Sequence, residues 1–391
     1  MFGRLRVVIC AIALALVGSP ALAQTDADRF GPKLIEEQVR IPARGGYEIV
    51  TTILRPQGEG RFGALILNHG VPVSRDERAR ESSDLLIGAA AVFARRGYVV
   101  LMPLRRGFGA TGGEFAEDPG SCANPDFRKG ELAASEDVMA AYEYARSLPY
   151  VDGSRMILAG QSAGGMVAIS TAALRAPEGL VAVLSFAAGR GGNPGATPGV
   201  PCAVEPLAEL LEAEGKRIKA PVLFHYAEND LFFNPQTTKY WYDRFTASGA
   251  RAEYVLQPAF GKDGHYIFSD MVGVRYWLPA VERFLAANNV PFERLDATDA
   301  NVLFALDKLP NLKTESCRNL YRAFLESPGP RAFALSSDGR CGFAGGLPEA
   351  GDIALRQCTA VAKTACSLYA VDQAVVWKPS PAEGVAVKTS N

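Results

Sequence analysis

The chain has 391 residues, of which 48% are hydrophobic, and its formal net charge is −1. This length and apolar content suffice for one large domain with a sizeable core and a smaller second unit. The 41 basic and 42 acidic residues form no basic stripe. The composition therefore excludes electrostatic binding of nucleic acid and predicts no attraction to an anionic membrane surface.

The first residues follow the order of a secretory signal peptide. Arg4 and Arg6 precede an uncharged run over residues 7–17, and the A-x-A pattern of Ala21, Leu22 and Ala23 completes the order. We therefore expect residues 1–23 to be a signal peptide and the mature protein to be periplasmic or secreted. The apolar run is short for a membrane span, so we expect no stable membrane insertion after cleavage; a retained N-terminal anchor is the alternative.

Strands and helices alternate up to about residue 288. Strands are expected at 33–41, 47–55, 64–67, 98–102, 156–159, 181–186, 222–226 and 252–256. Helices are expected at 85–95, 132–148, 163–174, 235–248 and 274–287. This alternation predicts a mostly parallel, eight-stranded sheet with helices on both faces and an antiparallel hairpin at its start, which is the architecture of an α/β-hydrolase fold.

The strand at 156–159 runs directly into Gly160-Gln161-Ser162-Ala163-Gly164-Gly165. With 39 glycines in the chain, GxSxG arises by chance roughly 0.2 times, so the motif depends on its context. Here a strand precedes it and a helix follows, as in a nucleophile elbow, where small residues allow a strained turn that exposes a serine hydroxyl. We therefore expect Ser162 to be a catalytic nucleophile.

A serine nucleophile needs a base, and a carboxylate that orients this base. In this fold the acid and then the histidine follow the serine along the chain. His265 lies in a glycine-bracketed loop after the last strand and is the expected base, whereas His225 lies inside a strand and is expected to be structural. Asp230 follows the strand at 222–226 and is the expected acid, with Glu228 and Asp263 as alternatives.

An oxyanion formed at the attacked carbonyl needs hydrogen-bond donors. The N–H of Ala163, directly after the nucleophile, is one expected donor. The second is expected from the turn after the third strand, where we favour the N–H of Val71 over that of Gly70. His69 is expected to order this turn by hydrogen bonding and is also a candidate for binding substrate.

Five segments together resemble known proteins: LNHG, RRGFGATGG, GQSAGG, AENDLFF and GKDGHYIF. They are similar to the dienelactone hydrolase-like and prolyl-oligopeptidase-like branches of the α/β-hydrolase superfamily, over roughly residues 33 to 287. The resemblance implies Ser162 as nucleophile, Asp230 as acid and His265 as base. Dienelactone hydrolases proper resemble cysteine-nucleophile enzymes, so the serine argues against dienelactone itself as substrate.

Two loops, over residues 105–128 and 187–220, are expected at the rim of an open site without a large lid. Arg106 and Arg190 are candidates for binding a substrate carboxylate, and Phe232 for lining a pocket. A salt bridge or a solvated surface position is the interpretation that we favour for the two arginines, and core packing is an equal alternative for the phenylalanine.

Cys10 lies in the expected signal peptide, which leaves six cysteines in the mature chain. An even number suits an oxidising compartment, and the expected disulfides are Cys122–Cys202, Cys317–Cys341 and Cys358–Cys366. The chain has no CxxC pair and only three histidines, so we expect no metal site, and the expected chemistry needs no cofactor.

The pattern changes near residue 295, which predicts a hydrolase domain over residues 24–295 and a small α+β domain over 296–391. In the second domain helices are expected at 296–309, 317–325 and 350–360, and strands at 331–336, 368–371 and 375–377. It resembles small domains of unknown role in bacterial exported proteins, and we expect it to be a binding or structural module.

The sequence thus predicts an exported serine hydrolase that cleaves a small-molecule carboxylic ester. An aminopeptidase or acyl-peptide hydrolase is the alternative; such enzymes usually carry a large N-terminal propeller, and only about ten residues precede the first strand here. A non-catalytic binding protein on a hydrolase scaffold is a further alternative. No feature of the sequence indicates an oligomeric state.

Overall fold

The computed structural model describes residues 34–295, 312 and 314–377. The expected signal peptide (1–23), the expected helix at 296–309 and the expected domain boundary at 295/296 concern residues outside or at the end of these ranges. Within the described ranges no helix is both long enough and apolar enough to cross a membrane.

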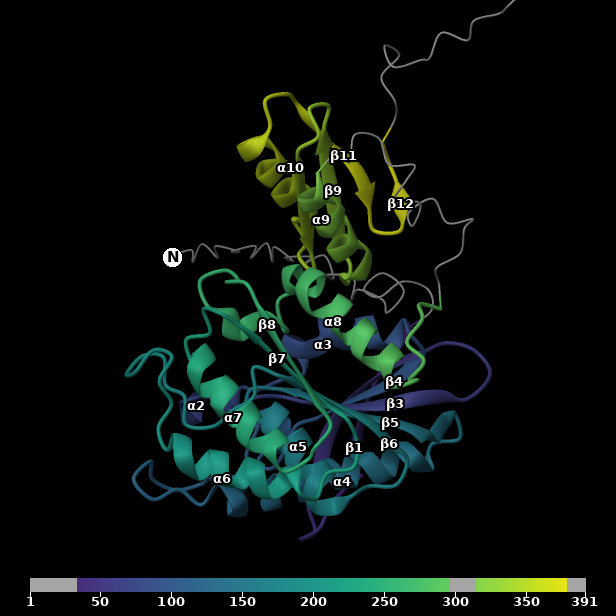
Figure 1. Ribbon diagram of the computed structural model, residues 1–391. Coiled ribbons are helices and arrows are strands. Elements are labelled where there is room, and N and C mark those ends of the chain that lie inside the picture. Colours follow the sequence, from purple (N-terminus) through teal and green to yellow (C-terminus); the bar gives the residue numbers. More distant parts are fainter. Residues whose placement is uncertain (1–33, 296–311, 313, 378–391) are drawn as a thin grey trace, which may run out of the picture.

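An eight-stranded sheet forms the centre of the larger unit (Figure 1). Its strands are β1 (Leu34–Pro42), β2 (Glu48–Pro56), β3 (Phe62–Asn68), β4 (Tyr98–Pro103), β5 (Val151–Gln161), β6 (Leu180–Phe186), β7 (Val222–Ala227) and β8 (Ala252–Gln257). Their order is β1-β2-β4-β3-β5-β6-β7-β8. The β1–β2 and β2–β4 pairs are antiparallel and all other pairs are parallel, which confirms the predicted fold class.

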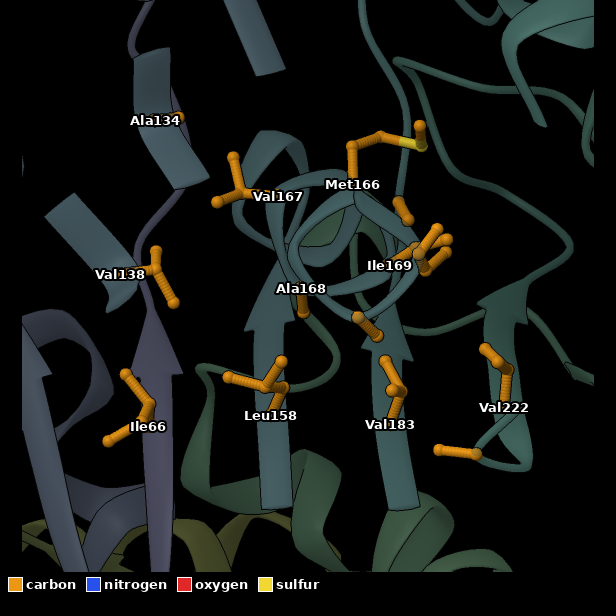
Figure 2. Close-up of a cluster of buried hydrophobic side chains, with 14 of the residues drawn as sticks. Ile66, Ala134, Val138, Leu158, Met166, Val167, Ala168, Ile169, Val183 and Val222 are labelled. Atoms are coloured by element: carbon orange, nitrogen blue, oxygen red, sulfur yellow. The ribbon is translucent and has the colours of Figure 1, made fainter. Parts of the chain in front are cut away.

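Helices cover both faces of this sheet (Figure 1). Helices α3 (Asp84–Ala94) and α8 (Val274–Ala287) pack on one face, with Phe93 stacked on Trp277. The other face carries α4 (Phe127–Ser147), α5 (Ala163–Arg175), α6 (Val204–Gly215) and α7 (Pro235–Ala247). Figure 2 shows α5 above the sheet, where Ala168 and Ile169 lie close to Leu158 and Val183 of the central strands.

The structure corrects several of the expected elements, and β5 begins at Val151, five residues before the expected start. The segment 187–220, expected to be a loop, contains helix α6, which buries Leu207 and Leu211. Helix α4 begins at Phe127, five residues before the expected start, because the Asp126 side chain accepts a hydrogen bond from the N–H of Lys129 and caps it. A short helix that was not predicted, α2 (Arg75–Ala79), follows the turn after β3.

The smaller unit has an antiparallel sheet in the order β10-β9-β11-β12. Its strands are β9 (Arg331–Ser336), β10 (Cys341–Gly345), β11 (Cys366–Val371) and β12 (Ala374–Val375), with helices α9 (Glu315–Glu326) and α10 (Ala350–Val361). Strand β10 was not predicted. The architecture confirms a separate small α+β region.

The two units meet through buried charges. Glu326, at the end of α9, forms ion pairs with Arg96 at 3.0 Å and with Arg294 at 2.7 Å. Burial alone would raise the pKa of Glu326, but Arg294 and Arg96 outweigh burial and lower it far below its ordinary value. Glu326 is therefore ionised where the two units meet. Arg95 also donates a hydrogen bond to the backbone carbonyl of Glu326.

One carboxyl group in the core is held in its neutral form. Glu214, near the end of α6, is 1% exposed. Burial raises its pKa from 4.5 to about 8. A pKa raised in the folded state contributes stability at acidic pH, and that contribution is lost as the pH rises through the folded value.

We predict that Glu214→Gln flattens the pH dependence of stability. The free energy of unfolding of the wild type should fall by up to about 1.4 kcal/mol per pH unit between about pH 5 and about pH 8 from this group. Urea unfolding at both pH values measures the slope. Glu209→Gln, an exposed position on the same helix, is the control and should keep the wild-type slope; an equal slope in all three proteins would contradict the assignment.

Candidate active site

Ser162 occupies a strained turn between β5 and α5. Its backbone φ of 58° and ψ of −128° are rare for a residue with a side chain. The N–H of Ser162 donates to the carbonyl of Phe186 at 2.9 Å, which ties the turn to the end of β6. The structure therefore has the strand, turn and helix of a nucleophile elbow at the residue where the sequence predicts it.

Glycines on either side of Ser162 allow this turn. A Cβ at Gly160 would clash with the carbonyl of Gly164, and a Cβ at Gly164 would clash with the carbonyls of Asn68 and His69. These neighbours are backbone atoms, which cannot move away as a side chain can. The start of α5 is thereby brought against the end of β3.

His265 and Asp230 lie together at the same edge of the sheet. Asp230 follows β7, and His265 belongs to a short 3-10 helix, η2 (Gly264–Tyr266), after β8. The Nδ1 atom of His265 lies 3.0 Å and 3.1 Å from the two carboxylate oxygens of Asp230. A proton on Nδ1 donated to this carboxylate leaves Nε2 as the free acceptor, which is the tautomer that a general base needs.

The Asp230 carboxylate is itself fixed by the backbone. Its Oδ1 accepts hydrogen bonds from the N–H groups of Phe232 and Phe233, at 2.8 Å and 3.0 Å, and the residue is 3% exposed. Of the two alternatives for the acid, Glu228 is exposed. Asp263 instead accepts hydrogen bonds from the backbone N–H groups of Leu231 and His265, so it holds the acid loop to the histidine loop.

Neighbouring side chains fix the His265 ring. Phe232 stacks on the imidazole, with ring centroids 4.0 Å apart and an interplanar angle of 23°. Phe233 contacts the same ring edge-on at 5.5 Å. The side-chain amide of Gln161 donates to the carbonyl of His265 at 2.6 Å, so the residue before the serine also positions the histidine loop.

The turn after β3 lies against the nucleophile. A Cβ at Gly70 would lie 3.2 Å from the Cβ and 3.6 Å from the Oγ of Ser162. Val71 follows in this turn, and Ala163 is the first residue of α5, where an N–H group has no carbonyl one helical turn earlier. The two predicted oxyanion donors therefore belong to segments that flank Ser162.

His69 is part of the interior support of this turn. Its Nδ1 lies 2.7 Å from the carbonyl of Gly70, and its Nε2 accepts from the N–H of Arg105 at 3.2 Å. Burial, aided by the charge of Arg105, lowers the pKa of His69 to about 3. His69 is therefore neutral, 4% exposed and outside the lining of the cavity described next, so its contacts are those of a residue that orders the turn.

A cavity of about 610 Å³ opens at Ser162. Ser162, His265, Gly70 and Val71 form one part of its lining, together with Phe232. The lining also includes side chains that the sequence analysis did not single out: Val73, Glu77, Arg80, Glu81, Leu85, Asn193, Pro194 and Tyr266. The size is ordinary for a small-molecule site.

The two arginines proposed for substrate binding are engaged elsewhere. Arg190 is 6% exposed and forms ion pairs with Glu117 at 2.8 Å and Glu131 at 2.7 Å. Arg106 pairs with Asp137 at 2.9 Å and with Glu136 at 3.2 Å. Neither lines the cavity, so the salt-bridge alternative describes both, whereas Phe232 does line it.

Three disulfides occur among the described residues, and they join the same pairs as expected. Cys122–Cys202 links the two rim loops, with Cα atoms 5.7 Å apart. Cys317–Cys341 and Cys358–Cys366 lie in the smaller unit. No group of three metal-ligating side chains is found in the described part of the chain.

The model of the dienelactone hydrolase family matches residues 86–265, a span that begins in α3 and ends at His265. A search of curated proteins gives no match. Solved structures with a similar arrangement include an esterase of Pyrococcus furiosus, 17% identical, with a TM-score of 0.46 over 65% of this chain and 90% of the other. An acetyl xylan esterase from Paenibacillus sp. R4 is 19% identical, with a TM-score of 0.45 over 66% and 84%.

A puromycin-hydrolyzing peptidase of Mycobacterium tuberculosis is also similar, 15% identical, with a TM-score of 0.42 over 66% of this chain and 40% of the other. These similarities concern the arrangement of the backbone. The strand order and the turn at Ser162 define the larger unit as an α/β-hydrolase fold. Residues 86–265 are similar to the dienelactone hydrolase family.

We predict that Gly164→Ala disrupts the elbow. The added Cβ meets two backbone carbonyls, so we expect a loss of about 2 kcal/mol or more in the free energy of unfolding. Gly153→Ala is the control, because its Cβ would meet only the flexible side chain of Arg146, at 3.4 Å. Thermal or urea unfolding measures both; equal stability of the two variants would contradict the packing argument.

Proposed function

We propose that this protein is an exported serine hydrolase that cleaves carboxylic esters. The observation that carries the proposal is the convergence of Ser162 and His265 on one cavity, with the Nδ1 of His265 3.0 Å from the buried carboxylate of Asp230. Such a convergence supplies a nucleophile, a base and an orienting acid in the roles that acyl transfer requires.

In the proposed reaction, the Oγ of Ser162 attacks the ester carbonyl while the Nε2 of His265 takes the hydroxyl proton. Asp230 stabilises the resulting imidazolium, and the N–H groups of Ala163 and Val71 donate to the oxyanion. The carbon–oxygen bond to the alcohol then breaks, and His265 returns its proton to the leaving alcohol. Water, deprotonated by His265, releases the acid from the acyl-enzyme and restores Ser162. No metal or organic cofactor takes part.

The proposed substrate is a small-molecule ester. A cavity of about 610 Å³ suits a ligand of drug-like size. The match to the dienelactone hydrolase family supports ester chemistry over amide chemistry, because a lactone is a cyclic ester. Dienelactone itself is not the substrate that we favour, because the nucleophile position holds a serine and not a cysteine.

Export is proposed from two independent features. The pattern of residues 1–23 is that of a signal peptide. Three disulfides join all six cysteines that follow this segment, and such bonds persist in oxidising compartments. We therefore place the mature protein in the periplasm or outside the cell.

We predict that a fluorophosphonate probe labels Ser162 and that Ser162→Ala abolishes both labelling and ester turnover. Asp230→Asn should lower kcat by about 10⁴-fold, because the orienting carboxylate is lost. Glu228→Gln, at the exposed carboxylate two residues away, should keep wild-type kcat. A folded wild-type protein that remains unlabelled would remove the enzyme hypothesis and favour a binding protein.

We predict turnover of p-nitrophenyl esters and little turnover of aminoacyl p-nitroanilides. Each substrate releases a coloured product, p-nitrophenol from the esters and p-nitroaniline from the anilides. The ratio of kcat/KM for the ester to kcat/KM for the anilide therefore reports the preference for ester over amide. A series of acyl lengths then identifies the acyl group that the cavity accepts. Activity confined to the anilides would replace the esterase proposal by the peptidase alternative.

A further inference from the structure

A row of alternating buried charges lies behind the turn that carries Val71. Arg105 binds Glu117 at 2.6 Å, Glu117 binds Arg190 at 2.8 Å, and Arg190 binds Glu131 of α4 at 2.7 Å. All four residues are at most 6% exposed. We refer to Arg105, Glu117, Arg190 and Glu131 as the buried charge row.

Arg105 connects this row to the turn. Its backbone N–H donates to the Nε2 of His69, and its guanidinium Nη1 donates to the backbone carbonyl of His69 at 3.0 Å. His69 in turn contacts the carbonyl of Gly70 through Nδ1. Arg105 therefore holds the backbone just before Val71, directly at His69 and through His69 at Gly70.

Glu117 compensates the buried positive charge of Arg105. Arg105 is 0% exposed, and a buried guanidinium without a carboxylate is strongly unfavourable. Burial alone would raise the pKa of Glu117, but Arg105 and Arg190 outweigh burial and lower it to about 2, so the carboxylate is charged between two cations. Gly130 of α4 permits its close approach, because a Cβ there would lie 2.8 Å from the Glu117 carbonyl.

A disulfide holds the two loops that supply the centre of the row. Glu117 precedes Cys122 in one loop and Arg190 precedes Cys202 in the other, and Cys122–Cys202 joins them. The N–H of Cys202 donates to the carbonyl of Gly191 at 3.0 Å, directly after Arg190. The disulfide thus covalently joins the two loops that carry Glu117 and Arg190.

We infer that Glu117 is a positioning residue for the oxyanion hole: through Arg105 it fixes the turn of His69 and Gly70, and thereby the direction of the Val71 N–H. Glu117 does not line the cavity and touches no reacting atom. The inference rests on the proposed function, because it concerns the donors of the proposed acyl transfer. It assigns a role to a residue outside the triad and the oxyanion donors.

The test compares ester and thionoester hydrolysis in Glu117→Gln. Sulfur accepts hydrogen bonds weakly, so an intact oxyanion hole favours the oxygen ester, and a misplaced N–H reduces that preference. We expect kcat for the oxygen ester to fall about 10²-fold, with KM within about threefold, and the ester-to-thionoester ratio of kcat to shrink about tenfold.

Glu326→Gln is the matched control. Glu326 is also a buried carboxylate shared by two arginines, Arg96 and Arg294, but it lies at the end of α9 and outside the lining of the active-site cavity. It should lower stability by an amount similar to that of Glu117→Gln and keep the wild-type ratio. This control separates a loss of stability from a loss of positioning.

Arg105→Lys is a second variant in case Glu117→Gln does not fold. It keeps the buried charge and the backbone N–H bond to His69 but removes the guanidinium fork, and it should give a change in the ratio in the same direction. Folded variants with the wild-type ratio, or with an effect on KM alone, would overturn the inference. A wild-type protein without ester turnover or labelling at Ser162 would instead overturn the proposed function, and the inference with it.

Discussion

The feature on which the site depends is the contact between the start of α5 and the end of β3. Because Gly160 and Gly164 have no side chains, the backbones of β5 and α5 lie directly against the carbonyls of Asn68 and His69. This contact forces Ser162 into its positive φ and sets the first turn of α5 beside the turn at Gly70. Packing of the main chain thereby brings the Ser162 hydroxyl, the N-terminus of α5 and the turn at Gly70 to one place.

Buried charges support this arrangement from behind. In an apolar interior an isolated ion is costly, so an arginine paired there with a carboxylate holds that carboxylate in a fixed position. The buried charge row uses this constraint between the loops after β4 and β6, and Glu326 uses it between the two units. Glu214 takes the other solution and stays protonated. The neutral His69 lies between the charge row and the backbone near Ser162.

Local patterns in the sequence were enough to predict the eight strands of the larger sheet, the elbow and the neighbourhood of His265 and Asp230. Continuous apolar runs indicate buried parallel strands, and the carboxyl ends of such strands meet at one edge. The partners of Arg106 and Arg190 were not predictable in this way, because Glu131 lies 59 residues from Arg190 and no local pattern links them. Helix α6 was missed because it begins after Ala203 in a left-handed conformation, without a side-chain cap.

Some missed features did leave signals. Ser74 and Glu77 form a capping box, which is visible as S-x-x-E and would have indicated α2 and hence the glutamates of the cavity lining. The stacking of Phe232 on His265 had no such signal, since it depends on two loops that meet only in the folded chain.

The most direct test of the account is a crystal structure of the protein after reaction with a fluorophosphonate. The account predicts a phosphorus–oxygen bond to the Oγ of Ser162, with the phosphoryl oxygen about 2.7 to 3.1 Å from the backbone nitrogens of Ala163 and Val71. The Nδ1 of His265 should remain bound to Asp230. An adduct on another residue, or a phosphoryl oxygen directed away from both nitrogens, would contradict it.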